Sequence, residues 1–93
     1  MSDFGRNNNL VLVIWSDTRE VESGTWHDMS EVIKTNSAEI KSVGWIIQET
    51  DRDLKISADI PTDITDTEVG RTTVIPRGCI EEIINVRCEK EDV

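Results

Sequence analysis

The most regular alternation of apolar and polar positions lies in residues 54–60, where apolar residues occupy every second position and polar residues fill the gaps. This period of two predicts a strand with one buried face. Residues 42–49 precede it across the polar quartet 50–53, and they carry apolar residues on both faces. Together the two runs predict a β-hairpin over residues 38–60, which is the centre of the expected fold.

A further strand is expected near the start of the chain, over residues 9–16. Its apolar residues fall on both faces, so it should lie in the middle of a sheet or beneath a second chain. Residues 17–27 then form a long polar loop, in which Gly24 permits a turn. Residues 61–70 are a second polar loop, placed after the central hairpin.

A short helix is expected between the first loop and the hairpin. Asp28 is a suitable N-cap residue, and Glu31 follows it three positions later, which is the spacing of a capping box. The helix should last one to two turns and end near Asn36. Its apolar stripe is expected to pack on the core, and it consists of Met29, Val32 and Ile33.

Two strands are expected at the C-terminal end of the domain. Residues 71–75 predict the fourth strand and residues 79–86 the fifth. Residues 76–78 separate them, because proline lacks a ladder donor and glycine tolerates a sharp bend. The isoleucines of the fifth strand do not alternate strictly, which predicts a β-bulge or an oligomer contact there.

Five short strands with one short helix predict a mainly β fold, an SH3-like five-stranded barrel, with an Sm-like barrel as the alternative. In the SH3-like architecture a single 3-10 turn joins the last two strands, and residues 75–80 suit that turn. This argument concerns the fold alone and carries no function. We expect a flexible N-terminus over residues 1–8, a single β-barrel domain over 9–86 and a charged C-terminal tail over 87–93.

The length and composition fit one small domain with a modest core, because the chain has 93 residues of which 37% are hydrophobic. No apolar run is long enough to cross a membrane. The N-terminal residues do not have the pattern of a signal peptide. Cys79 and Cys88 are too few for a disulfide framework, so reduced thiols in a cytoplasm are expected.

The chain is strongly acidic, with a formal charge of −9 and a pI near 4.4. Such a surface keeps a small protein soluble and repels nucleic acid polymers, so no polymer partner is expected. Two interpretations stay open: a solvated acidic surface, or an acidic face that imitates DNA and blocks an enzyme. Much of the negative charge lies in loops and terminal segments, which favours the first interpretation.

No pattern of catalytic or metal-binding residues is visible, so we expect a protein that is not an enzyme and has no cofactor and no metal. The single histidine, His27, has no nucleophile or orienting carboxylate at a recognisable spacing. It is also far in sequence from both cysteines, which excludes the usual zinc spacings. No Walker-type, Rossmann or EF-hand pattern is present.

The most informative aromatic residues are the three tryptophans, and the chain has no tyrosine. Trp45 lies in the middle of a strand and is expected in the core, and Trp15, which closes the first strand, is expected in the core or at a rim. Trp26 lies in a polar loop, where it either fixes the loop to the barrel or offers a flat face to a ligand. An aromatic face beside guanidinium groups is a usual way to hold a nucleobase and its phosphates. The expected ligand-binding residues are Trp26, His27, Arg71, Thr72, Thr73 and Arg77.

Three short motifs resemble a recurring family of small acidic bacteriophage proteins: residues 24–26 (GTW), 42–47 (SVGWII) and 75–80 (IPRGCI). The similarity covers roughly residues 9–86. The motifs consist of glycines, a proline and aromatic residues, so they indicate kinship more than activity. The resemblance implies a phage anti-defence protein of the host cytoplasm, similar to sponges that sequester cyclic oligonucleotide signals.

The expected function is therefore a non-enzymatic counter-defence protein that binds and sequesters a small anionic signal nucleotide. Because the monomer is acidic, the pocket should lie between subunits of a homo-oligomer, where arginines of two chains outweigh screened acids. The alternatives are an acidic protein–protein inhibitor of a host defence enzyme and a structural or adaptor module of the phage. No membrane partner is expected.

Overall fold

The computed structural model describes residues 9–21 and 24–87. The predictions of a flexible N-terminus and a charged tail concern residues that lie outside these ranges, apart from Arg87. The sheet consists of β1 (Leu10–Asp17), β2 (Ala38–Glu49), β3 (Asp53–Asp59), β4 (Gly70–Pro76) and β5 (Ile80–Asn85). A short helix, α1 (Met29–Lys34), lies between β1 and β2, and a 3-10 turn (Arg77–Cys79) lies between β4 and β5.

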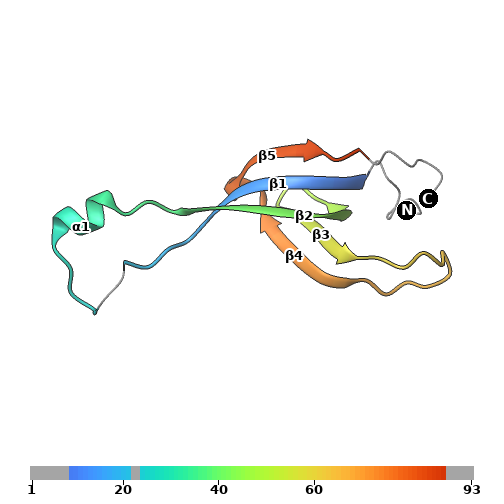
Figure 1. The fold of residues 1–93 in the computed structure, drawn as a ribbon, viewed down its shortest axis with the longest axis horizontal. Helices are drawn as coiled ribbons and strands as arrows, with labels where there is room; N and C mark the ends of the chain where they lie inside the picture. Colours follow the sequence, from blue (N-terminus) through green and yellow to red (C-terminus); the bar gives the residue numbers. More distant parts are fainter. Residues whose placement is uncertain (1–8, 22–23, 88–93) are drawn as a thin grey trace.

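All five strands form one antiparallel sheet in the order β4-β3-β2-β1-β5 (Figure 1). The predicted mainly β fold with one short helix is confirmed. A 3-10 turn does join β4 to β5, where residues 75–80 predicted it. The sheet is not closed, because β4 and β5 remain its two edges, so the predicted barrel is not confirmed.

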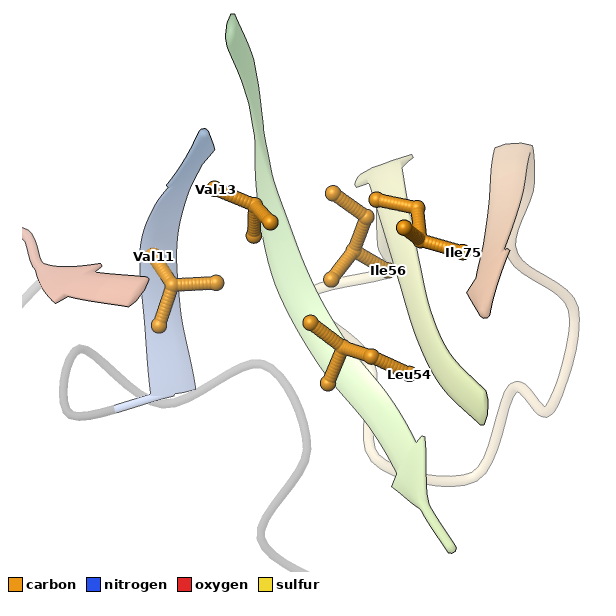
Figure 2. Packing of buried hydrophobic residues seen from close by; sticks show 5 residues of the cluster. All are labelled: Val11, Val13, Leu54, Ile56 and Ile75. Carbon is orange, nitrogen blue, oxygen red and sulfur yellow. The ribbon is translucent and has the colours of Figure 1, made fainter. Parts of the chain in front are cut away.

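The hydrophobic core lies on one face of the sheet, and its residues come from strands far apart in the sequence (Figure 2). Alternate residues of β1, β3 and β4 point to this face, which follows from the two-residue period of a strand. The apolar side chains that are almost completely buried are Val11, Val13, Leu54, Ile56 and Ile75. Trp15 packs against this cluster, as the sequence predicted for it.

Gly44 lies in β2 at a point where β3 approaches so closely that a side chain would not fit. A Cβ atom at this position would lie 2.9 Å from the backbone oxygen of Ser57 and 3.2 Å from Cβ of Ile56. The backbone oxygen belongs to a strand and cannot rotate away as a side chain would. β2 and β3 can therefore approach this closely only because Gly44 has no side chain.

Replacing Gly44 with alanine is expected to lower the free energy of unfolding by about 1–3 kcal/mol, as overpacking does elsewhere. Urea denaturation followed by tryptophan fluorescence measures the change. Gly78→Ala is the matched control, because a Cβ atom at Gly78 meets nothing within 4 Å. Equal stabilities of the two variants would contradict a close approach at Gly44.

The fifth strand contains the predicted irregularity. Ile14 of β1 lies opposite Glu82, whereas the next residue, Trp15, lies opposite Ile80, so Glu81 is an extra residue in β5. The bulge turns the Glu81 carboxylate toward β1, where it accepts a hydrogen bond of 2.5 Å from Ser16 Oγ. The prediction of a β-bulge is therefore confirmed.

The hairpin of β1 and β2 continues beyond the rest of the sheet. The pairing of β5 with β1 stops at Trp15, but the pairing of β2 with β1 continues to Asp17 and Ala38. The chain then leads to α1, which lies far from the core at the end of a projection (Figure 1). We call residues 16–21 and 24–39 the arm. It contributes to the elongated shape, with extents of 55 × 25 × 24 Å.

Candidate binding surfaces

Arg71 is the second residue of β4 and has a left-handed backbone conformation, with φ of 52°. Its side chain is held by one carboxylate, that of Asp59 on β3. Nε donates to Oδ2 at 2.8 Å and Nη2 donates to Oδ1 at 3.0 Å. The hydrogen bonds and positive charge of Arg71 lower the pKa of the Asp59 carboxyl group below its ordinary value. The Arg71 guanidinium group is therefore already paired with a carboxylate of its own chain.

The ion pair of Arg71 and Asp59 is expected to add a small, acid-sensitive stabilisation. The folded pKa of Asp59 is lowered, so this stabilisation is complete above the ordinary pKa of 3.8 and is lost as pH falls through the lower folded value. Asp59→Asn should therefore be less stable than wild type at pH 7, and the difference should disappear in strong acid. Urea denaturation at both pH values tests this. A difference that persists in strong acid would contradict the ion-pair explanation.

Arg77 lies in the 3-10 turn and connects it to the turn between β2 and β3. Its Nε donates to the backbone oxygen of Thr50 at 3.1 Å, and its Nη2 donates to Glu49 Oε1 at 2.8 Å. Its backbone N–H also donates to the oxygen of Arg52 at 2.8 Å. These three bonds give Arg77 a structural role, which is to fix the connection between β4 and β5 against the central hairpin.

The two threonines predicted as ligand contacts lie within β4 and face opposite sides of the sheet. Thr72 Oγ1 shares a hydrogen bond of 2.6 Å with Ser57 Oγ, whose residue is completely buried. Thr73 lies opposite Ile56, a core residue, and is half-buried. Because a buried hydroxyl group needs a partner, the Thr72 bond is part of the fold.

Trp26 and His27 lie on the arm, just before α1. The Trp26 side chain is almost entirely in solvent, with 93% of the residue exposed. His27 is half-buried, and its Nδ1 lies 4.0 Å from Glu31 Oε1 without a hydrogen-bond partner. Trp26 therefore does not fix the loop to the sheet, which was one of the two interpretations left open by the sequence.

The six residues predicted to bind a ligand do not form one pocket within a single chain. Arg71 and Arg77 are six residues apart on β4 and its extension, which corresponds to about 20 Å along a strand. Trp26 and His27 lie on the arm just before α1, and α1 lies away from β4 (Figure 1). A pocket that unites these residues needs a second chain, and it stays a prediction.

The sequence predicts that the apolar stripe of α1 packs on the core. That expectation is wrong, because no residue of α1 is buried. Met29 is 79% exposed and Ile33 is 77% exposed, while Val32 is about half exposed. Asp28 does precede the helix as its N-cap, but its side chain makes no capping hydrogen bond.

The exposed apolar residues of α1 and Trp26 gather at the end of the arm, and we call them the arm tip: Trp26, Met29, Val32 and Ile33. Single exposed apolar residues are common on proteins, but a group of large ones indicates an interaction site. One feature of the sequence does indicate that these apolar residues are exposed. The helix is short and follows a long polar loop, so it has little means of reaching the core.

Comparison with protein families, curated proteins and solved structures found no match to this chain. The resemblance to phage proteins therefore stays a prediction. In residues 9–21 and 24–87, no three histidine, cysteine, aspartate or glutamate residues gather closely enough to hold a metal ion. Within the same ranges no helix is long and apolar enough to cross a membrane.

Proposed function

We propose that this chain is a non-enzymatic binding protein whose arm tip is the contact surface for another protein. The observation that carries the proposal is a helix with no buried residue that presents large apolar side chains beside an exposed tryptophan. Burial of each such side chain contributes about 1.5–3 kcal/mol. Tryptophan is also among the residues that most often dominate binding energy at protein interfaces.

The structure of the arm itself supports a role in binding. Isolated helices shorter than about 12 residues are marginal in water, and so is an isolated two-stranded hairpin. Contact with a partner would therefore order the arm and bury its apolar residues at the same time. Asp28 and Glu31 are exposed beside the arm tip, so the partner surface should be apolar with basic groups at its border.

Photo-crosslinking in producing cells tests the arm tip directly. A photoreactive phenylalanine analogue at position 26 should give an adduct of defined mass, whose partner mass spectrometry identifies. Position 64 is the control, because Ile64 is 87% exposed but lies in the loop between β3 and β4. Equal crosslinking at both positions would show that exposure alone causes the reaction, and it would overturn the proposal.

The same assay distinguishes the arm-tip proposal from the alternative of an acidic protein–protein inhibitor that acts through its charged face. Glu81→Gln combined with Glu82→Gln neutralises two exposed carboxylates of β5. If the arm tip is the contact surface, this variant keeps the position-26 adduct. If an acidic face that imitates DNA is the contact surface, neutralisation removes binding while Trp26→Ala leaves it unchanged.

Sequestration of a small anionic signal nucleotide is the second candidate function, and the exposed ring of Trp26 favours it, because both faces of the indole are free to stack on a base. The carboxylates that hold Arg71 and Arg77 count against it within one chain. A thermal-shift screen with cyclic dinucleotides and trinucleotides tests it. A ligand at a hundredfold excess over its Kd should stabilise the protein by about 2.7 kcal/mol. No shift with any nucleotide would remove this candidate.

The finer description of the fold as SH3-like is also a proposal. It is supported by the strand order β4-β3-β2-β1-β5, in which β1 pairs with both β2 and β5, and by the 3-10 turn before β5. The Sm-like alternative is a related small barrel. The resemblance adds the setting of a bacteriophage accessory protein in the host cytoplasm, either as a counter-defence protein or as an adaptor of the phage.

A further inference from the structure

The outer face of the sheet, opposite the core, carries a second exposed apolar surface. Leu12 of β1 lies opposite Val43 of β2 and Ile84 of β5, so three apolar residues form one row across three strands. Val43 is 55% exposed and Ile84 is 38% exposed. We call this surface the outer strip, and it consists of Leu10, Leu12, Ile14, Val43, Trp45 and Ile84.

No residue of the outer strip is fully buried, although β1 is flanked by strands on both sides. The core uses the other face of β1, through Val11 and Val13. The described part of the chain therefore has two apolar surfaces without a covering layer, the arm tip and the outer strip. A sheet face of this kind is normally covered, because burying apolar area is the main favourable term in association.

Each surface has one lysine among acidic residues beside it, so the lysine of one surface can pair with an acid of the other. Lys41 and Glu82 lie on either side of Ile14, at the end of the outer strip nearest the arm. The arm tip carries Asp28 and Glu31 near the start of α1 and Lys34 in its last turn. An arm tip placed on an outer strip can therefore set its acidic residues against Lys41 and its lysine against Glu82.

Both surfaces also belong to one continuous ribbon, the hairpin of β1 and β2. Apart from Ile84 of β5, the outer strip occupies the part of the ribbon inside the sheet, and α1, which carries most of the arm tip, lies beyond the far end of the ribbon (Figure 1). Two copies of such a ribbon, placed antiparallel about a twofold axis, bring each arm tip to the other copy's outer strip. The contact is made twice and the assembly is closed, as in the commonest class of homo-oligomer.

We infer that the partner of the arm tip is a second copy of this chain, and that two copies exchange arms so that each arm tip covers the outer strip of the other. The inference rests on the proposed function and names its partner. It also explains why both surfaces are apolar although only one of them projects. Other proteins that bind the arm tip are outcomes of the test below.

Size-exclusion chromatography with light scattering on the purified chain is the first test. Arm exchange predicts a mass about twice the 10.5 kDa of one chain. A tip variant, Trp26→Ser with Ile33→Ser, and a strip variant, Val43→Glu, should each run as a monomer with unchanged circular dichroism. Ile64→Ser is the control and should remain a dimer, because Ile64 belongs to neither surface.

Mixing the two variants distinguishes arm exchange from other dimers. The tip variant keeps an intact outer strip and the strip variant keeps an intact arm tip, so the mixture should form a heterodimer with one of the two contacts. A monomeric wild-type chain, or a dimer that only the tip variant disrupts, overturns the inference. If the chain is monomeric and position 26 still crosslinks to a different protein, the proposed function stands and only the inference fails.

Discussion

Replacing Leu54 with alanine is expected to lower the free energy of unfolding by about 2–5 kcal/mol, as deletion of a buried leucine side chain does in other cores. Leu54 has no exposed surface, and in the described part of the chain its core contains four other apolar residues that are at most 2% exposed. At about 0.05–0.15 kcal/mol per residue, a chain of this size has a total stability of roughly 5–14 kcal/mol. The variant should therefore lose a large fraction of its stability.

Urea denaturation with far-UV circular dichroism measures this loss, and Ile64→Ala provides the matched control. Ile64 is a similar apolar residue but is 87% exposed, so its truncation should change stability by less than about 0.5 kcal/mol. A similarly small effect of Leu54→Ala would contradict the core described here. A loss so large that the variant does not fold would agree with it, and Leu54→Val then gives a measurable intermediate.

The sheet could be predicted from the sequence because its strands carry strong local patterns. Residues 54–60 alternate with a period of two, and the structure places Leu54 and Ile56 on the buried face of β3. The break at residues 76–78 also had a local cause, proline followed by glycine. The 3-10 turn begins directly after Pro76, which ends β4 opposite Asp53 and has no N–H to donate to a ladder.

The position of Trp45 could not be predicted in the same way. The sequence placed Trp45 in the core, because it lies among apolar residues in the middle of a strand. In the structure it is half-buried and lies on the outer face, opposite Ser57 and Leu10. Both faces of β2 are apolar near this residue, so periodicity did not show which face the core would use.

For α1, the local sequence pattern predicts the boundaries of the helix but not whether its apolar stripe is buried. The positions of Asp28 and of the apolar stripe gave its boundaries within two residues. Whether the stripe is buried depends on the length of the ribbon that carries it, which is set by the pairing of Asp17 with Ala38. That pairing is a contact between residues far apart in the sequence.

Chemical type alone identifies candidate ligand residues in the sequence, and it does not show which groups of the fold their side chains contact. Arg71 and Arg77 are cations in an acidic chain, so each finds a carboxylate on a neighbouring strand or turn. Such pairs lie on the surface and contribute little stability, but they occupy the guanidinium groups that a phosphate would need. The sequence did not reveal these partners, because they depend on strand register.

Replacing Trp26 with alanine is expected to weaken binding at the arm tip strongly while it leaves the fold unchanged. Truncation of a tryptophan at the centre of an interface typically costs about 2–4 kcal/mol, which corresponds to about a 30- to 700-fold increase in Kd. The free energy of unfolding of the monomer should change by less than about 0.5 kcal/mol, because only a small part of the Trp26 surface is covered.

The contrast between binding and stability makes this prediction informative. Sedimentation equilibrium over a range of concentrations gives the Kd of self-association, and urea denaturation of dilute protein gives the stability of the monomer. Ile64→Ala should alter neither quantity, since Ile64 is equally exposed but lies outside the arm. If Trp26→Ala lowers monomer stability instead, the indole packs against its own chain in solution, and the arm tip is not a free contact surface. If it changes neither quantity, self-association does not use the arm tip. Only an increase in Kd at constant stability agrees with an arm tip that binds a second copy of the chain.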